Sequence, residues 1–390
     1  MPALRLTFLA SGAAMGLLHP FLVVILQTRG FSAPEIGVVT ALGGVGFALA
    51  VPVWGHLGDV TLGRARAFQF GAIGAGAAMV GLGAPVPGIV IGVMVVVYFA
   101  FQSSFSALGD ALAVSILPDP GRQYGRIRLL QSLAFAVATI SAGFLYNRLG
   151  YGPAPLLWGL GALLTAAGLI PLTRIPQRRE VRAAGARGGS IRLALASQPR
   201  LWGVLVAVGL TYIGIMAGNT YIALRLVALG GQSSDVALSA GLAAFAEIPA
   251  MAVGGWLARR IGLRALFAIS ALVYAVCILS WTILGSPEAI LATRLVTGLV
   301  FAEIWMACVF TMRVLLPDGL QASGQALYQT TAAGVGSVVA NGFGGILYGA
   351  VGPGMFAFAA VATFIGAGVA WATLPHAVQS RAGLERRPRD

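Results

Sequence analysis

Twelve long apolar runs, each long enough to cross a membrane as a helix, dominate this sequence of 390 residues. A helix rises about 1.5 Å per residue, so about 20 apolar residues span the roughly 30 Å hydrocarbon core. Only 9% of the residues are charged, where soluble domains carry about 25%. We therefore predict an all-α membrane protein with twelve transmembrane helices. They are expected at about 4–28, 34–57, 66–84, 88–116, 127–147, 153–173, 201–227, 235–257, 263–284, 288–315, 321–349 and 353–374.

The turns between the runs carry helix start and stop signals. Ser32 and Glu35 have the spacing of a capping box, and Pro34 falls in the first turn of the helix that they predict. The proline-containing turns at 84–88 and 117–121 separate the fourth run from its two neighbours.

The arginines predict the orientation. All 25 basic residues are Arg, and with the N-terminus in the cytoplasm 21 of them face the cytoplasm and 4 face the opposite side. Because positive residues concentrate in cytoplasmic loops, both termini are expected in the cytoplasm of a bacterial plasma (inner) membrane. Their position in turns between apolar runs argues against a nucleic-acid partner, despite the net charge of +13.

Two similar halves are the next prediction. At offsets of 200 and 199 residues the chain repeats Gly30 as Gly230, Glu35 as Asp235, Gly55 as Gly255, and 117–119 as 316–318. We expect six-helix bundles at 1–173 and 200–375, an Arg-rich cytoplasmic linker at 174–199 and a cytoplasmic tail at 376–390. With helix order and cytoplasmic turns shared, the halves are parallel repeats about an axis along the membrane normal.

With these features, the chain resembles the major facilitator superfamily of transporters. Its cytoplasmic signature, Gly-x-x-x-Asp-Arg-x-Gly-Arg-Arg/Lys, is matched in type by Gly55, Asp59, Gly63 and Arg64, although Val60 replaces the usual Arg and Gly63 comes one residue late. The resemblance implies a gate at this charged turn, where Asp59 would pair across the halves. The gating set that we expect is Gly55, Asp59, Gly63, Arg64, Arg66, Arg126 and Arg128.

Four short segments resemble the branch of lactose-permease-like and phenylpropionate-permease-like proteins, which also holds nucleoside–proton symporters. The segments are 30–37, 124–129, 246–249 and 324–328. The resemblance implies a sugar, a nucleoside or an aromatic acid as the solute.

Ionisable residues within spanning helices are costly and usually functional, at roughly 2.5–3.5 kcal/mol near the bilayer centre. Glu247 lies midway along the eighth run, two residues before Pro249, which we expect to break the helix. Glu303 lies in the tenth run, one of the four that line the cavity in the superfamily. We expect both carboxylates to carry protons or to contact the solute, with structural hydrogen bonding as the alternative. Arg294, in the same run as Glu303, is a further candidate for coupling or solute contact. It is out of phase with Glu303, so the two are not expected to pair.

Other polar positions have weaker signals. Asp110 is expected to form a structural or gating ion pair with Arg126 or Arg128, and His19 is expected to be a packing residue or, less often, a coupling residue. The remaining candidates for cavity lining are polar or aromatic, and simple packing is the alternative for the aromatic ones. They are Gln27, Phe101, Gln102, Ser103, Tyr212, Asn219, Tyr221, Trp305 and Asn341.

Taken together, the sequence predicts a secondary active transporter that works by alternating access, not an enzyme. Proton-coupled symport is favoured because the fifth run lacks the Gly-Pro-rich signature of drug–proton antiporters; a drug or sugar efflux antiporter is the alternative. The chain has no phosphate-binding Gly-x-x-x-x-Gly-Lys motif and no His/Cys metal cluster, and Cys277 and Cys308 lie in apolar runs. We therefore expect no cofactor and no metal, with the solute, protons and the lipid bilayer as partners of a monomer.

Overall fold

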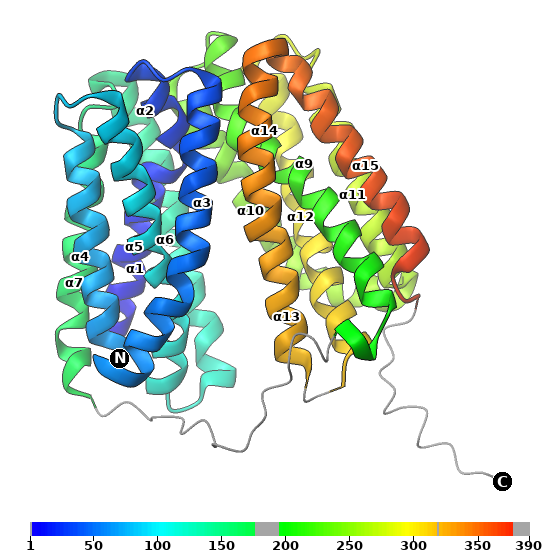
Figure 1. Ribbon diagram of the computed structural model, residues 1–390, viewed down its shortest axis with the longest axis horizontal. Coiled ribbons are helices and arrows are strands. Elements are labelled where there is room, and N and C mark those ends of the chain that lie inside the picture. The colour runs from blue at the N-terminus through cyan, green and yellow to red at the C-terminus, as the bar shows by residue number, and fades with distance from the viewer. Residues whose placement is uncertain (1, 176–194, 318–319, 377–390) are drawn as a thin grey trace. The chain divides into compact units, whose positions relative to one another are not determined.

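The structure, a computed structural model, describes residues 2–175, 195–317 and 320–376 (Figure 1). Within these ranges the chain is helical apart from its turns. The first half holds α1 (Pro2–Leu18), η1 (His19–Phe21), α2 (Leu22–Thr28), α3 (Ala33–His56), η2 (Leu57–Thr61), α4 (Arg64–Leu82), α5 (Gly88–Ile116), α6 (Pro120–Leu149), α7 (Ala154–Leu169) and η3 (Pro171–Arg174). The second half holds α9 (Arg200–Ala228), α10 (Ser233–Ile261), α11 (Leu263–Ser280), α12 (Pro287–Leu315), α13 (Gln321–Gln329), η5 (Thr330–Val335), α14 (Gly336–Val351), η6 (Gly352–Gly354) and α15 (Met355–Thr373).

The predicted all-α membrane fold is confirmed. Ten stretches of the described residues are long and apolar enough to cross a membrane, and the last, Gly324–Thr373, covers both the α13–α14 run and α15. Each of the twelve expected segments coincides with a helical run of the structure, and most boundaries agree within a few residues. The largest shift is at α6, which begins at Pro120 rather than near 127, because proline suits the first turn of a helix.

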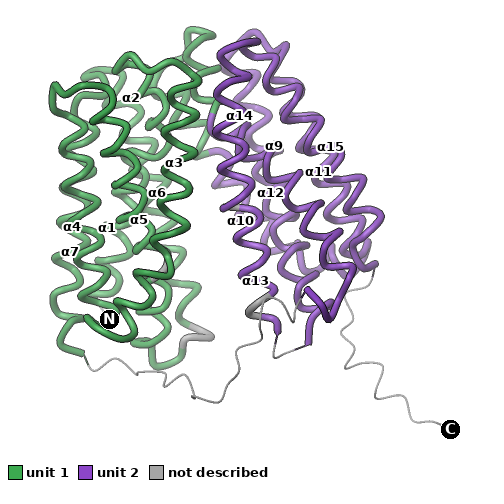
Figure 2. Tube along the Cα trace, viewed as in Figure 1, with its two compact units in different colours: residues 1–181, 221–241 green, residues 182–220, 242–390 purple. Residues whose placement is uncertain are grey.

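The chain divides into two compact units, drawn in different colours in Figure 2. Unit 1 comprises 1–181 together with 221–241, and unit 2 comprises 182–220 together with 242–390. The dividing points fall inside α9 and α10, so the hairpin that joins these two helices belongs to unit 1. The predicted division into bundles at 1–173 and 200–375 stays a prediction. The linker and the tail lie largely outside the described residues.

Unit 1 is built around α1 and α5. α1 packs against α6 and α7, and α5 packs against α3 and α4. Small residues allow the close contacts: a Cβ atom at Gly161 in α7 would lie 2.7 Å from the Cβ of Ala14 in α1. In unit 2, α11 packs against α12 and α15. Packing of this kind suits a membrane interior, where helices associate through small residues rather than through the hydrophobic effect.

The internal repeat extends to the backbone. Gly30 and Gly230 have φ angles of 87° and 83°, and Gly63 and Gly262 have φ angles of 81° and 85°. These left-handed conformations favour glycine, so each pair marks an equivalent turn in the two halves.

The helix caps repeat in the same way. The capping box of α3 is confirmed: the Ser32 hydroxyl accepts from the Glu35 amide, and the Glu35 carboxylate accepts from the Ser32 amide at 2.8 Å. Two hundred residues later the Asp235 carboxylate accepts a hydrogen bond from the backbone N–H of Gln232 at 2.7 Å. The sequence match of Glu35 with Asp235 therefore reflects a shared helix start.

Two local expectations are wrong. The charged segment 55–66 is mostly helical, because α3 continues to His56 and η2, a π-helical turn, continues to Thr61. The true turn is at Gly63, since its left-handed backbone is what ends the helix. Pro249 lies inside an unbroken α10, so the expected break beside Glu247 is absent; a proline removes one hydrogen bond of a helix, and the bonds around it hold the helix together.

Candidate functional site

An ion pair links η2 to the start of α4 across the turn at Gly63. Arg64 Nε lies 2.8 Å from Asp59 Oδ1, and Arg64 Nη1 donates to the Ala111 carbonyl oxygen at 3.3 Å. Arg64 therefore ties the end of α5 to the α3–α4 turn, and Asp59 pairs within its own turn. Arg66, also in the expected gating set, is exposed. The role of this turn in gating stays a prediction.

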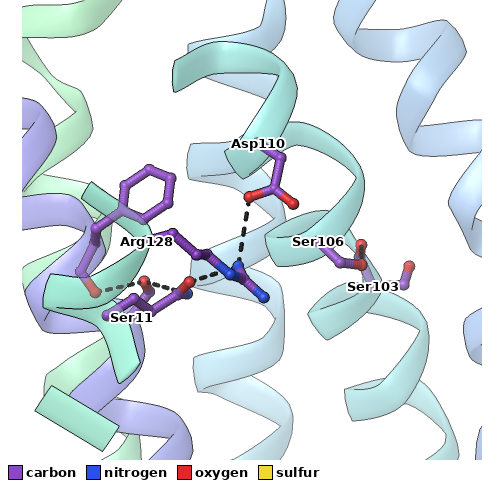
Figure 3. A network of polar contacts seen from close by, with 7 residues as sticks. Ser11, Ser103, Ser106, Asp110 and Arg128 are labelled. Carbon is purple, nitrogen blue, oxygen red and sulfur yellow. Dashed lines mark hydrogen bonds and ion pairs between the residues drawn. The ribbon is translucent and has the colours of Figure 1, made fainter. Parts of the chain in front are cut away.

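A second polar network links α5, α6 and α1 (Figure 3). Arg128 Nη1 lies 3.4 Å from Asp110 Oδ1 and donates to Gln131 Oε1 at 2.6 Å. Gln131 in turn donates to the Ser11 hydroxyl at 3.1 Å. Both members of the ion pair are about half exposed, so their attraction is screened. Asp110 thus contacts Arg128, one of its two expected partners, while Arg126 is exposed.

In unit 2, a buried cation lies within the spanning helices. Arg294 in α12 is only 6% exposed, and its Nη1 donates to Asn219 Oδ1 in α9 at 3.0 Å. The same Asn219 oxygen accepts from the Tyr274 hydroxyl of α11 at 3.4 Å. The Arg294 guanidinium also lies 5.8 Å from the ring centroid of Trp281, a geometry in which the ring face attracts a cation. These four residues are called the Arg294 cluster below.

Glu247 in α10 interacts electrostatically with Arg294 of this cluster. Glu247 is half-buried and lies within electrostatic range of Arg294. The structure therefore brings together three of the predicted site residues from three helices, Glu247, Asn219 and Arg294. An intramembrane carboxylate near a buried arginine is the usual setting of a substrate or ion site in membrane proteins.

Glu303 lies elsewhere on α12. It is 6% exposed, and its Oε2 atom is buried without a hydrogen-bond partner among the described residues. A Cβ atom at Gly254 in α10 would lie 2.7 Å from this oxygen, so the carboxylate occupies the space that the glycine leaves. As predicted from their spacing, Arg294 and Glu303 have different surroundings.

The remaining candidates are placed as follows. In unit 1, His19 Nε2 hydrogen-bonds the hydroxyl of the buried Tyr98, and the Ser103 hydroxyl donates to its own helix at the Ala100 carbonyl. His19 therefore has a packing contact of the kind expected for it, and the Ser103 hydroxyl is used within its own helix. Two further candidates in unit 1 are buried, Gln102 and Tyr221. In unit 2, Trp305 is 36% exposed, unlike its neighbour Glu303.

The sequence-based site missed three residues of unit 2 that the structure adds. Tyr274 and Trp281 complete the Arg294 cluster, and Thr297 accepts from Arg294 Nη1 at 3.3 Å. Thr297 follows Arg294 by three residues, and this spacing on one helix face could have identified it. Tyr274 and Trp281 carry no such signal, because aromatic residues in apolar runs usually pack.

Solved structures with the same arrangement are membrane transporters. A mutant of the nucleoside transporter NupG matches with a TM-score of 0.82 at 14% identity, over 96% of this chain and 99% of that chain. A mutant of the peptide transporter POT matches with a TM-score of 0.74 at 13% identity, over 95% and 93%. At such identities the likeness establishes the fold alone, and that fold is the one of the major facilitator transporters.

The sequence comparisons identify the family. The model of the MFS_1 like family matches residues 3–360, and the chain belongs to this family. The maltose permease of Geobacillus stearothermophilus is 32% identical over 339 residues, 86% of this chain and 84% of the relative. The probable 3-phenylpropionic acid transporter of Escherichia coli (strain K12) is 28% identical over 260 residues, 66% and 67% of the two chains. The protein is therefore a multi-pass membrane transporter of small molecules and not an enzyme.

Proposed function

We propose that this transporter is a proton-coupled symporter for a small organic solute, with sugars ahead of nucleosides and aromatic acids. The observation that carries the proposal is the Arg294 cluster, which provides a buried cation, an amide and aromatic groups with Glu247 in electrostatic range. The similarity to a maltose permease puts sugars first. Alternating access then follows from the rocking of two repeats around one site.

Asn219 is the residue best suited to contact the solute. Its side chain is exposed, while its oxygen is held by Arg294 and Tyr274. Because those two donors fix the amide, its NH₂ group is oriented to donate to a hydroxyl or carbonyl of the solute. Arg294 acts as the positioning residue for Asn219 and as a charge that Glu247 balances.

Glu303 is the proposed proton carrier. An ionised carboxylate without a partner costs several kcal/mol in an apolar interior, and Glu303 Oε2 has no partner among the described residues. The group therefore gains by binding a proton and is ionised only when a path to water opens. Glu247 is the second candidate, since its charge balances Arg294 when the solute is absent.

The test uses purified protein in proteoliposomes with an imposed inward proton gradient and radiolabelled maltose, uridine or 3-phenylpropionate. We expect one of the three solutes to accumulate against its gradient, and its entry to alkalinise the outer medium. Glu303→Gln is expected to abolish accumulation while solute exchange continues, and Glu247→Gln is expected to lose accumulation as well. Glu288→Gln, a change at an exposed residue in the first turn of the same helix, serves as the control.

Opposite outcomes are decisive. Acidification of the medium on solute entry means antiport, and it would establish the efflux alternative. Unchanged accumulation in both Glu303→Gln and Glu247→Gln would remove proton coupling through these carboxylates.

We also propose that both termini are cytoplasmic in a bacterial inner membrane. The arginine asymmetry supports this orientation.

We further propose that the ion pair of Asp110 with Arg128 stabilises one state of the cytoplasmic gate. Charge reversal tests the pair: Asp110→Arg and Arg128→Asp each reduce transport, and the double variant restores it. Failure of the double variant to exceed either single variant would refute a direct functional pair.

A further inference from the structure

A pocket with polar groups in its wall lies in unit 1, at the end of the helices opposite to the start of α1. It has a volume of about 340 Å³, and its wall comes from α2, the end of α6 and the hairpin between α9 and α10. All of its lining residues belong to unit 1, whereas the Arg294 cluster belongs to unit 2. A volume of this size lies within the range of small-molecule sites.

The lining is rich in amides and hydroxyls and has no charged side chain. Gln27 and Gln232 present amides, which both donate and accept hydrogen bonds, whereas the two Nδ2 hydrogens of Asn147 are used within the wall. The exposed side chain of Gln27 makes no hydrogen bond to a described residue, so its amide is available to a ligand. An uncharged site with several amides suits a neutral ligand with many hydroxyl groups, since an ionic ligand would find no countercharge.

Two tyrosines add an aromatic wall. The rings of Tyr146 and Tyr151 lie 5.6 Å apart at an angle of 59°, and the Tyr146 hydroxyl donates to the Leu17 carbonyl oxygen at 2.8 Å. The Tyr151 hydroxyl is hydrogen-bonded to Ser233, another residue of the lining. Tyr146 is only 2% exposed, so the partly exposed ring of Tyr151 is the aromatic face open to the pocket. Such a face beside hydrogen-bonding groups matches a sugar ring, which has an apolar C–H face and a polar edge.

The pocket exists only while its walls are together. Asn147 Nδ2 donates to Gln232 Oε1 at 2.9 Å and to Ser234 Oγ at 3.0 Å, and the Ser234 amide donates to Asn147 Oδ1 at 3.0 Å. These bonds hold α6 against the α9–α10 hairpin. A ligand that contacts both sides binds this arrangement better than one in which the sides have parted, and it therefore shifts the population towards it.

We propose that this pocket is a second binding site for a neutral carbohydrate, separate from the transport site, and that its occupation favours closure of this end of the transporter. Uptake of the transported solute is then inhibited at a high concentration of this carbohydrate on the same side. The ligand class rests on the lining of the pocket and does not require that the same compound be carried.

The binding test uses alkylation of an engineered cysteine. Thr28 lines the pocket and is exposed, and Cys277 and Cys308 are buried and are replaced by alanine. In the Thr28→Cys variant, maltose is expected to slow labelling by a membrane-impermeant maleimide. At about 20 mM maltose and a Kd of about 1 mM, the slowing is about twenty-fold, because the free fraction falls as 1/(1 + [L]/Kd).

Matched variants locate the effect. When Gln27→Leu is added to the Thr28→Cys variant, maltose is expected to give no protection. Gln123→Leu makes the same change at the other end of the bundle and is expected to preserve the protection. Gly285→Cys, in the exposed turn before α12, serves as the labelling control and is expected to be insensitive to maltose.

Two outcomes overturn the proposal. The first is equal labelling of Thr28→Cys with and without maltose. The second is protection that survives Gln27→Leu but is lost in Arg294→Met, because it would place the ligand at the Arg294 cluster. Because labelling needs no transport, a failure of maltose uptake refutes the sugar assignment under the proposed function and leaves this test intact.

Discussion

The contact between α6 and α10 gives a sharp prediction about conformational balance. Within unit 1, a Cβ atom at Gly143 would overlap the Cβ of Ala237. It would also lie 3.0 Å from the backbone carbonyl oxygen of Ser233 and 3.0 Å from the Cα of Ser234. Backbone and a short side chain cannot move aside as a flexible side-chain tip can. Gly143→Ala therefore forces the two helices apart.

The magnitude follows from the cost of overpacking. Adding a methyl group to a tightly packed contact costs about 1–3 kcal/mol. The cost falls only on the state in which α6 and α10 touch, whereas the gain in helix propensity from glycine to alanine is common to all states. The equilibrium therefore shifts about 5- to 150-fold towards the state with separated helices. Gly125→Ala in the same helix has no atom within 4 Å of the new Cβ, so it is expected to shift nothing.

The assay is the alkylation rate of Ser233→Cys in the background without native cysteines. Ser233 is 9% exposed in the closed contact, so its labelling reports the open population. We expect Gly143→Ala to accelerate labelling at least about five-fold, the lower limit of that shift, and Gly125→Ala to leave the rate unchanged. Equal rates in the two variants would refute the reasoning, because the contact would then not control the equilibrium.

Three further outcomes test other contacts. Asp59→Asn removes the ion pair with Arg64 and is expected to change transport rate while sparing solute affinity in equilibrium binding; a changed affinity would contradict a gating role. Gly254→Ala places a methyl group 2.7 Å from Glu303 Oε2, so gradient-driven accumulation of the solute is expected to fall while solute exchange persists. Intact accumulation would show that the carboxylate moves freely. Ser32→Ala removes one half of a capping box and is expected to lower the free energy of unfolding by about 0.5–2 kcal/mol, measured by thermal unfolding in detergent; an unchanged Tm would contradict this value.

Much of the fold was predictable because each signal is local. Span length, the Ser32–Glu35 box and the glycines at the turns act within a few residues of the chain. The repeat was visible for the same reason, since Gly30 and Gly230 serve the same local conformation. The errors were also local: a glycine-rich charged segment suggested a turn, where a π-helical turn continues the helix to Thr61.

The candidate site was predictable only in part. Glu247, Glu303 and Arg294 are conspicuous because ionisable residues are rare in apolar runs. Asn147 and Gln232, which lie at helix ends, look like solvated polar residues in the sequence, yet they line the pocket of unit 1. Their role depends on residues 85 positions apart meeting, and no short pattern records that.

The sequence by itself determined which segments span the membrane, their order and their twofold repetition, since hydropathy and turn chemistry are properties of adjacent residues. Only the tertiary structure decided which polar groups meet. Arg294 finds Asn219 75 residues away, and Glu303 fits where Gly254 leaves space. The physical reason is that a buried polar group is stabilised or left without a partner by the neighbours that packing brings, and packing between helices is set by the whole bundle.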